Sequence, residues 1–309
     1  MKTVLDLGCK PEQIIFANPI KTQAQLEFAA KHKVWKMTFD SEEELEKIAR
    51  HCSKAEVVLR IGTVATDAKW ELSSKFGAFM EDVPKLLSEA KRLKLNLIGV
   101  SFHVGTGGVS FTSYEESLRN ARKVFDLVEK IGMEPLRLLD IGGGYAMCKI
   151  DPAHYEQRNF TAVAPLISFL IDELFDEDVE VIGEPGTFVV ESSLYLLSRI
   201  IGTKTIARGE EVKKHYYINN GLYKGYMLRL FDEPQYLRPL DPAHEKRPKH
   251  SSTYWGQTCD SCDYVFKDQK MPLMNYDEWV ITAEAGAYVV DLSTPFNGFD
   301  EPKIHYIRK

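Results

Sequence analysis

Residues 136–145 read LRLLDIGGGY, a short hydrophobic run that ends in an aspartate and is followed by three consecutive glycines. A run of this length bounded by glycine is typical of a buried strand. Consecutive glycines lose much conformational entropy on folding, so they indicate a turn in which the backbone approaches a neighbour closely. That neighbour is either a phosphate held by an amide nest or the packing of a tight turn between a strand and a helix. The sequence alone leaves both interpretations open.

The same pattern, a strand followed by polar residues or glycine and then a helical segment, occurs six times between Ile14 and about Val190. The candidate strands are IIFAN, VWKMTFD, VVLRI, LNLIGVSFHV, LRLLDIG and VEVIGEP. Strands that alternate with helices predict a parallel sheet. Six units in a row favour a (β/α) barrel, whose chemistry lies at the carboxyl ends of the strands, although a complete barrel has eight. A doubly wound sheet is the alternative.

The predicted helices follow hydrophobic periodicity with end signals. They are QAQLEFAAKH, SEEELEKIARHC, VPKLLSEAKRLK, YEESLRNARKVFDLVEKIG and VAPLISFLIDELF. Ser41 with Glu44 three residues later predicts a capping box. Gly132 predicts a helix stop.

The pattern changes after residue 192, where segments rich in β-branched and aromatic residues alternate with turn signals. We therefore predict two domains, an incomplete (β/α) barrel over residues 1–192 and a mostly antiparallel β domain over residues 193–309. The segment PLDPAHEKRPKHSST, residues 239–253, is charged and rich in proline, which predicts an exposed loop.

Composition excludes several classes of protein. The 309 residues are 44% hydrophobic and 27% charged, as in ordinary globular proteins, and carry a net charge of −6. There is no basic stripe for nucleic acid and no apolar run near the roughly 20 residues that span a bilayer. The start, MKTVLDLGCKPEQ, lacks the features of a signal peptide. Five scattered cysteines predict a reducing, cytoplasmic location.

Two stretches that follow strands carry candidate chemistry. SFHVGTGG, residues 101–108, would place His103 at the barrel mouth, or else in an ordinary strand-end turn. GEPGTF, residues 183–188, places Glu184 at the end of the last barrel strand. A carboxylate there can be a metal ligand, a general base or the partner of a protonated ring nitrogen, or a charge on the rim.

The stretch WGQTCDSCD, residues 255–263, has the spacing of a zinc or redox dithiol, Cys259 to Cys262. Zinc is disfavoured because no second pair of ligands accompanies it. The flanking aspartates oppose a low thiol pKa. We therefore predict no metal site.

Taken together, these stretches resemble the eukaryotic ornithine decarboxylase family of pyridoxal phosphate (PLP) lyases, which includes the antizyme inhibitors. The matching pieces include IIFANPIK, VVLRIGT, SFHVGTGG, LLDIGGGY, GEPG, INNGLY, LFDE, WGQTCDSCD, AGAY and FNGF, in family order over nearly the whole chain. The resemblance implies an alanine-racemase-like, PLP-binding (β/α)8 barrel, here with six of its eight strands, followed by the β domain. It also implies a head-to-tail dimer with active sites at the interface.

By this resemblance, His103 would stack on the cofactor ring and Glu184 would pair with the ring nitrogen. Gly143, Gly144 and Tyr288 would hold the phosphate. The other expected cofactor-binding residues are Thr106, Pro185 and Gly186.

The resemblance also implies residues for substrate and dimer. Asp232, and Cys259 with Asp260 entering the partner's site, would act on a small basic amino acid. The expected dimer contacts are an ion pair of Lys75 with Asp263, close approach at Gly286, and Phe296.

The chain departs from the family pattern in several places. The Schiff-base lysine motif resembling PFYAVKCN, and the next one resembling GFDCAS, do not occur, so we expect the chain to begin after the second barrel strand. Lys21 does not replace that lysine, because the family has a lysine there as well. Where the family has the phosphate-binding arginine of EPGR, this chain has Thr187. Where the family has an arginine just before the segment LSxKFG, this chain has Glu71. A hydroxyl cannot supply the charged fork of a guanidinium.

These features support a decarboxylase of polyamine biosynthesis, converting ornithine to putrescine and CO2 by family resemblance, that is catalytically impaired or a pseudoenzyme. It would form a homodimer or a heterodimer with an ornithine decarboxylase. The alternative is a non-catalytic regulator like antizyme inhibitor. Antizyme would contact residues 31–56, where a run of glutamates and Glu56 disfavour an acidic partner; a solvated helix face explains the run. A third possibility is a fragment with two open sheet edges.

Overall fold

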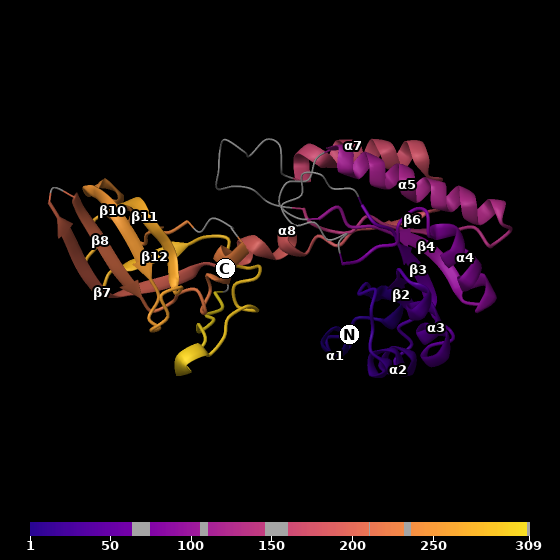
Figure 1. The fold of residues 1–309 in the computed structure, drawn as a ribbon, viewed down its shortest axis with the longest axis horizontal. Coiled ribbons are helices and arrows are strands. Elements are labelled where there is room, and N and C mark those ends of the chain that lie inside the picture. The colour runs from indigo at the N-terminus through magenta and orange to yellow at the C-terminus, as the bar shows by residue number, and fades with distance from the viewer. Residues whose placement is uncertain (64–74, 106–110, 146–159, 210, 232–235, 308–309) are drawn as a thin grey trace. The chain divides into compact units, whose positions relative to one another are not determined.

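The computed structural model describes residues 1–63, 75–105, 111–145, 160–209, 211–231 and 236–307 (Figure 1). The chain divides into two compact units, Met1–Gly186 and Thr187–Lys309. We call them the β/α unit and the β unit and describe each by itself. The domain boundary after residue 192 stays a prediction.

The β/α unit is built on a six-stranded sheet in the order β1-β2-β3-β4-β5-β6. All neighbours are parallel. The strands are β1 (Ile15–Phe16), β2 (Lys36–Phe39), β3 (Glu56–Arg60), β4 (Asn96–Ser101), β5 (Leu138–Asp140) and β6 (Glu180–Ile182). A doubly wound sheet needs a point where the strand order reverses, and this order does not reverse. The predicted six barrel strands are therefore confirmed.

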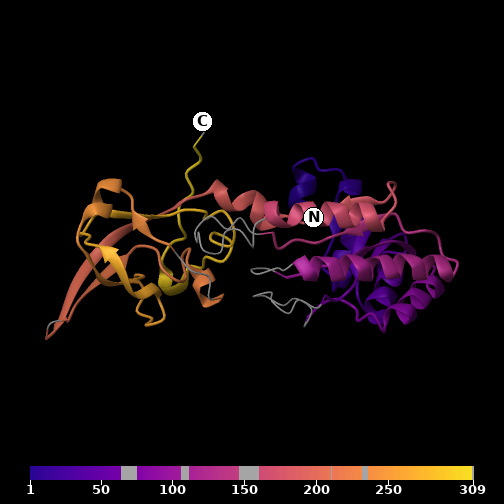
Figure 2. The ribbon, with the colours of Figure 1, turned by 90° about the horizontal axis from the view of Figure 1, so that it is seen from above.

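The five predicted helices follow strands in the described residues, and a short helix that was not predicted, α1 (Lys2–Asp6), precedes β1. The five are α2 (Gln23–Lys31), α3 (Glu42–His51), α4 (Val83–Arg92), α5 (Phe111–Lys130) and α7 (Phe160–Leu174), and a 3-10 turn lies at Pro11–Gln13. Figure 2 shows α5 and α7 side by side, where the Phe125 and Phe175 rings meet edge to face at 5.1 Å between centroids. Gly132 follows α5 with φ +65°, as a helix stop requires.

Apolar side chains from five strands meet in one cluster. Val58, Ile98 and Leu138 are buried there, and Ile15 and Ile182 pack against them. Because Ile15 lies on one edge strand and Ile182 on the other, both edges reach the same cluster and the sheet must curve around it. This curvature is what an open part of a barrel requires.

The N-terminus of helix α3 is capped differently from the prediction. The Ser41 hydroxyl accepts the N–H of Glu44 at 3.3 Å, as expected. The Glu44 carboxylate, however, lies buried against Lys21, 3.0 Å from its ammonium, and 2.6 Å from the Lys47 ammonium. The predicted reciprocal bond of a capping box is therefore wrong, because a buried lysine needs the carboxylate more. The interpretation of the glutamate run as a solvated face is likewise wrong at Glu44.

The β unit contains a second sheet, in the order β11-β10-β8-β7-β12-β9. Its neighbours are antiparallel except β10 and β8, which are parallel. The predicted mostly antiparallel domain is confirmed. The strands are β7 (Leu196–Arg208), β8 (Glu211–Ile218), β9 (Arg238–Pro239), β10 (Lys249–Trp255), β11 (Tyr264–Pro272) and β12 (Trp279–Thr282). The helical segments are α8 (Gly186–Val190) and 3-10 turns at Glu191–Ser193, Met227–Phe231, Pro242–Lys246 and Phe296–Gly298.

The predicted exposed loop over residues 239–253 is wrong in its last part. Residues 249–253 belong to β10, which lies between β8 and β11, and Ser252 is fully buried. The polar composition misled the prediction, because the Ser252 hydroxyl is satisfied locally by the carbonyl of His250. The strand is held by pairing on both sides and by Tyr254, which is fully buried in the core.

Candidate functional site

Ionisable side chains gather at one edge of the parallel sheet. Arg60 and Asp140 are the last residues of β3 and β5, and Asp40 directly follows β2. His103 and Glu184 come two residues after β4 and β6. Because the carboxyl ends of parallel strands meet at the same edge, these five side chains lie around one mouth. Arg60 interacts electrostatically with Glu184, Asp40 and Asp140, in that order of strength.

The glycine run lies between the loops that follow β4 and β6. A Cβ at Gly142 would stand 2.3 Å from the carbonyl oxygen of Phe102. At Gly143 it would stand 2.3 Å from the carbonyl oxygen of Glu184, and at Gly144 it would stand 1.9 Å from that of Gly105. All three positions therefore exclude any other residue for reasons of packing alone. The tight-turn interpretation has direct support, and contact with a phosphate stays a prediction.

His103 is held as a neutral imidazole. Its Nδ1 accepts the N–H of Gly105 at 3.1 Å, so the neutral ring carries its proton on Nε2. Burial, with a smaller contribution from the Arg60 guanidinium, lowers the pKa of His103 to about 4. The imidazole borders the glycine run, since its Nε2 lies 3.3 Å from the position of a Cβ on Gly143. A flat uncharged ring at this place suits stacking on another ring.

Asp140 is the buried acid of the site. Its side chain is not exposed, and its Oδ1 accepts the N–H of Gly142 at 2.9 Å. Burial first, and then the negative charge of Glu184, raise the pKa of Asp140 to about 7. Glu184 itself is exposed, and its backbone N–H donates to the carbonyl of Gly142 at 2.7 Å. Gly142 therefore hydrogen-bonds both the side chain of Asp140 and the backbone of Glu184.

Arg60 completes the mouth. Its guanidinium lies 5.5 Å from the centre of the Phe76 ring, and the exposed Lys75 lies 5.0 Å from the same ring. Tyr145, just after the glycine run, is buried, and burial is the main reason that its pKa rises to about 12. The negative charges of Asp140 and Glu184 also raise the pKa of the Tyr145 hydroxyl.

Lys21 has a structural role. Its ammonium is fully buried, donates to the carbonyls of Thr38, Pro19 and Asn18, and pairs with Glu44. With four acceptors around it, this lysine is not free to react with a carbonyl substrate or cofactor.

In the β unit, Asp263 organises the loop of the CxxC motif. Its carboxylate is 2% exposed. It accepts from the backbone N–H of Leu222 at 2.7 Å and from the backbone N–H and hydroxyl of Thr258 at 2.9 and 2.7 Å. A Cβ at Gly221 or Gly256 would stand 2.1 or 2.0 Å from the same carboxylate. Asp263 is therefore bound within its own chain, and a dimer ion pair with Lys75 stays a prediction.

Asp260 lies in the same loop. It accepts the N–H of Cys262 at 2.9 Å and the hydroxyl of Tyr223. These two donors, the N–H first, lower the pKa of Asp260, so it is ionised at neutral pH. The Tyr223 ring stacks on Phe296 at 4.3 Å between centroids.

The two cysteines of the motif are exposed, free thiols. Within the described residues, no group of three or more His, Cys, Asp and Glu side chains is placed to hold a metal ion. Cys259 lies beside Asp260 as the sequence requires, and its place in a partner's site stays a prediction.

Other candidate residues lie elsewhere in the β unit or outside the described residues. Gly286 meets the carbonyl of Val190, where a Cβ would stand 1.7 Å away, so packing within the chain already demands glycine. Tyr288 is 53% exposed. Glu184 was predicted to lie at the end of the last barrel strand, but β6 ends two residues earlier, at Ile182, and Thr187 lies in α8. Thr106, Asp232 and Glu71 fall outside the described residues.

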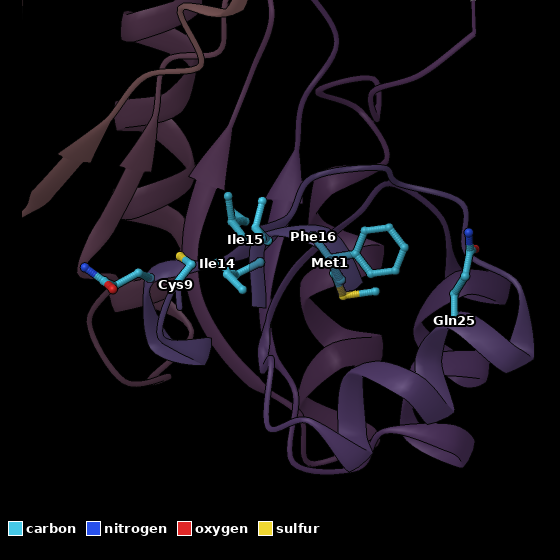
Figure 3. Close-up of a pocket in the computed structure, with 8 residues that line it drawn as sticks. Met1, Cys9, Ile14, Ile15, Phe16 and Gln25 are labelled. Atoms are coloured by element: carbon cyan, nitrogen blue, oxygen red, sulfur yellow. The ribbon is translucent and has the colours of Figure 1, made fainter. Parts of the chain in front are cut away.

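A separate cavity lies between α1 and β1. It has a volume of about 480 Å³ and is lined by Met1, Val4, Cys9, Gln13, Ile14, Ile15, Phe16 and Gln25. Figure 3 shows Met1 beside the Phe16 ring and Cys9 beside Ile14. No acidic or basic side chain lines it. The mouth at the strand ends, with its five ionisable side chains, is therefore the stronger candidate site.

Known proteins share this arrangement. The family described as "pyridoxal-dependent decarboxylase, pyridoxal binding domain" matches residues 1–191. The ornithine decarboxylase of Cricetulus griseus is 37% identical over 322 residues, which cover 99% of this chain and 69% of the relative. This chain belongs to the ornithine decarboxylase family. Antizyme inhibitor 2 of Xenopus laevis belongs to the same group, at 35% identity over 320 residues that cover 99% of this chain and 68% of the relative.

The fold of this decarboxylase family member also matches a solved structure. The arginine decarboxylase of Paramecium bursaria Chlorella virus superimposes with a TM-score of 0.90 at 31% identity, covering 99% of this chain and 80% of that one. PLP is the cofactor that the family implies. No helix in the described ranges is long and apolar enough to cross a membrane.

The described residues of this family member fit the ring of PLP. Neutral His103 has a flat ring suited to stacking, and Glu184 is an exposed carboxylate of the kind that can pair with a protonated ring nitrogen, so both stay predicted contacts of PLP. Asp140 adds a buried carboxyl oxygen without a donor in the described residues. For the phosphate, Thr187 stands where the family sequence pattern has arginine, so that half fits less well.

Sequence reasoning missed several members of these sites, among them Asp40, Arg60, Asp140, Tyr223 and Thr258. The signal for the first three was available, because each is an ionisable residue at or near the end of a predicted strand. Nothing in the sequence pointed to Tyr223, whose contact with Asp260 joins two loops far apart in the chain, or to Thr258, whose hydroxyl donates to Asp263 within one irregular loop.

Proposed function

We propose that this chain is a PLP-dependent decarboxylase of a basic amino acid, with ornithine as its first candidate substrate, and that its hold on the cofactor phosphate is weakened. The product would then be putrescine, a polyamine precursor. The observation that carries the proposal is the constellation of His103, Asp140 and Glu184 at the strand ends, followed by Thr187 where the family pattern has arginine.

The residues at the mouth have distinct parts in this proposal. His103 supports one face of the cofactor ring, and its low pKa keeps it uncharged near Arg60. Glu184 accepts a hydrogen bond from the ring nitrogen and favours its protonated form. Bound PLP supplies an electron sink for the carbanion left when CO2 departs. The glycine run holds the backbone of Glu184 in place through the carbonyl of Gly142.

The substrate end of the site would come from a second subunit. Asp260 is ionised at neutral pH, because the N–H of Cys262 and the hydroxyl of Tyr223 lower its pKa. It therefore suits the distal ammonium of a basic amino acid, and Cys259 beside it suits proton delivery. A dimer that brings this loop to a partner's mouth is part of the proposal.

Thr187 sets the expected defect. A hydroxyl gives one neutral hydrogen bond where a guanidinium gives a charged pair, and charged hydrogen bonds are worth about 1.5–3 kcal/mol each. Affinity for PLP is therefore expected to be about tenfold to a hundredfold lower than with arginine at this position.

The test is a PLP titration of the purified chain, followed by absorbance and by melting temperature, for the wild type and for Thr187→Arg. We expect Thr187→Arg to bind PLP at least about tenfold more tightly. Thr187→Val, which removes only the hydroxyl, is the matched control and should differ little from the wild type. Equal affinities for the wild type and Thr187→Arg would contradict a phosphate defect. Failure of all three to bind PLP would contradict the decarboxylase itself.

A regulator that resembles antizyme inhibitor is the second candidate. Its support is the 35% identity to antizyme inhibitor 2 together with the missing phosphate arginine. Mixing the chain with an active ornithine decarboxylase, or with antizyme, and measuring the mass of any complex separates the two candidates. A stable complex without PLP binding would favour the regulator.

A further inference from the structure

The starting observation is a carboxyl oxygen that has no donor. Asp140 lies at the end of β5 with no exposed surface. Its Oδ1 accepts the N–H of Gly142. Its Oδ2 is also buried, and no described residue donates a hydrogen bond to it. An ionised oxygen in that position loses the free energy of hydration without compensation, which is one of the larger costs in a folded protein.

Asp140 is flanked on both sides by the strand ends that carry the site. In the sheet register it pairs with Ser101 of β4 and with Ile182 of β6. Gly142 links the two acids, because its N–H donates to Asp140 Oδ1 and its carbonyl accepts the N–H of Glu184. The negative charge of Glu184 acts on the Asp140 carboxyl, so two neighbouring carboxyl groups interact here, one buried and one exposed.

Other charged groups face the pair. Arg60 of β3 is the cation, but its charge also acts on Asp40. His103 of β4 is neutral, as its lowered pKa requires. Tyr145 follows on the same loop, and its raised pKa keeps it protonated. Among the described residues, Arg60 is thus the one cation that acts on these three carboxyl groups, which is too little positive charge to keep all of them ionised.

Two neighbouring carboxyl groups hold a proton between them, because ionising both places like charges close together. The buried group keeps the proton, since burial penalises its charged form more. A protonated Asp140 has a hydroxyl on Oδ2, which removes the missing-donor problem and gives Glu184 a hydrogen bond.

We propose that Asp140 and Glu184 share one proton, held on Oδ2 of Asp140, so that the pair offers a single negative charge to the ring nitrogen of PLP. This inference rests on the proposed function for its ligand. Asp140 acts here as a positioning residue. Its Oδ1 fixes Gly142, its Oδ2 orients the Glu184 carboxylate, and its neutrality leaves one negative charge for the one positive charge of a protonated ring nitrogen.

Asparagine is a close mimic of protonated aspartic acid at this site. Its oxygen can accept from Gly142, and its NH2 can donate to Glu184 as the acid hydroxyl does. We therefore expect Asp140→Asn to bind PLP as the wild type does at pH 6, within about threefold, and Asp140→Ala to bind about tenfold more weakly. Ser101→Ala, which removes a buried hydroxyl at the adjacent strand end, is the matched control.

The pH dependence separates the proposal from a purely structural role. Between pH 6 and pH 9 the wild type should lose affinity relative to Asp140→Asn, by about tenfold, as the shared proton leaves. Comparing the two proteins at each pH cancels the titration of the cofactor itself. If Asp140→Asn instead binds as weakly as Asp140→Ala at pH 6, the acid works in its ionised form and the proposal is overturned.

A second measurement needs neither variant nor cofactor. At pH 6 carboxyl groups with ordinary pKa values are ionised, so infrared absorption of a protonated carboxyl in the cofactor-free wild type reports the pair. We expect this band at pH 6 and its loss by pH 9. Its absence at pH 6 would overturn the shared proton. If the infrared band is present but neither the wild type nor any variant binds PLP, the proposed function is contradicted and the shared proton is still supported.

Discussion

Each unit carries a pair of aspartate or glutamate side chains close together, and the surroundings of the two pairs differ. In the β/α unit, Asp140 receives one backbone N–H, and its pKa rises. In the β unit, the carboxylate of Asp263 receives three donors, two from the backbone and one from Thr258. Asp260 receives two, and its pKa falls. Burial and the charge of Glu184 favour the protonated form of Asp140, whereas hydrogen-bond donors favour the ionised form of Asp260.

This difference follows from backbone geometry. The loop over residues 256–263 closes on itself, because the N–H of Gly256 donates to the carbonyl of Asp263. The N–H groups of Thr258 and Cys262 donate to carboxylates of the same loop. The glycine run in the β/α unit has its neighbours' carbonyl oxygens packed against it instead. One loop thus presents donors to its carboxylates, and the other presents acceptors near its acid.

The largest predicted effect is on stability against pH. Because the folded-state pKa of Asp140, about 7, lies above its ordinary value of 3.8, the folded protein holds this proton more tightly than the unfolded chain does. Its contribution is fully present below the ordinary pKa and is lost as pH rises to about 7. At about 1.4 kcal/mol per unit, the loss is on the order of 4 kcal/mol.

Asp140→Asn should lack this loss. Urea unfolding of the wild type and Asp140→Asn at pH 5, 6, 7 and 8 checks it, with the variant becoming progressively the more stable of the two. Parallel curves over this range would mean that Asp140 has an ordinary pKa and that the contrast between the units does not exist.

The second largest predicted effect is a loss of stability when Asp263 of the β unit is changed to asparagine. Asp263→Asn places an NH2 group against a donor whichever way the amide turns, because both carboxylate oxygens accept hydrogen bonds. A buried donor left without an acceptor costs about 1–3 kcal/mol, so we expect the β unit to lose about 2 kcal/mol of unfolding free energy at pH 7. The measurement is urea unfolding followed by a signal from the β unit.

Asp268→Asn is the control for that substitution, since Asp268 is an exposed residue in a surface ion pair with Lys213. Such pairs contribute about 0–1 kcal/mol. If Asp263→Asn is no worse than Asp268→Asn, the donors around Asp263 do not define its role.

The smallest effect concerns Asp260 alone. Tyr223→Phe removes one of its two donors and leaves the N–H of Cys262 in place, so the pKa of Asp260 should rise toward its ordinary value without returning to it. Carbon NMR of labelled aspartate carboxyl groups during a pH titration measures this shift. Tyr264→Phe changes a nearby ring that stacks on Arg229 and serves as the control. An unchanged Asp260 titration in Tyr223→Phe would show that the tyrosine hydroxyl is not a donor of consequence.

The sequence predicted the order and direction of the barrel strands well, because each is a local pattern closed by a turn. It failed at β10, where Ser252 is buried by strand pairing that no local pattern reveals. It placed His103 and Glu184 at strand ends, which alternation of strands and helices is enough to do. It could not assign the partners of Asp263, because Leu222 lies 41 positions away in the chain and Thr258 lies in the same irregular loop, so both contacts depend on how the loops fold and pack.

The interlocked glycines also bear on how the family can change over time. Each of Gly142, Gly143 and Gly144 is required by the carbonyl oxygen of an adjacent loop, with or without any ligand. A descendant that had given up PLP would still be selected to keep all three, simply to fold. Position 187 carries a side chain, so the packing constraint that requires glycine does not apply there. The residue at this position can therefore change once phosphate binding is no longer selected. In lineages of this fold, the glycine run therefore traces ancestry, and the residue after EPG traces use.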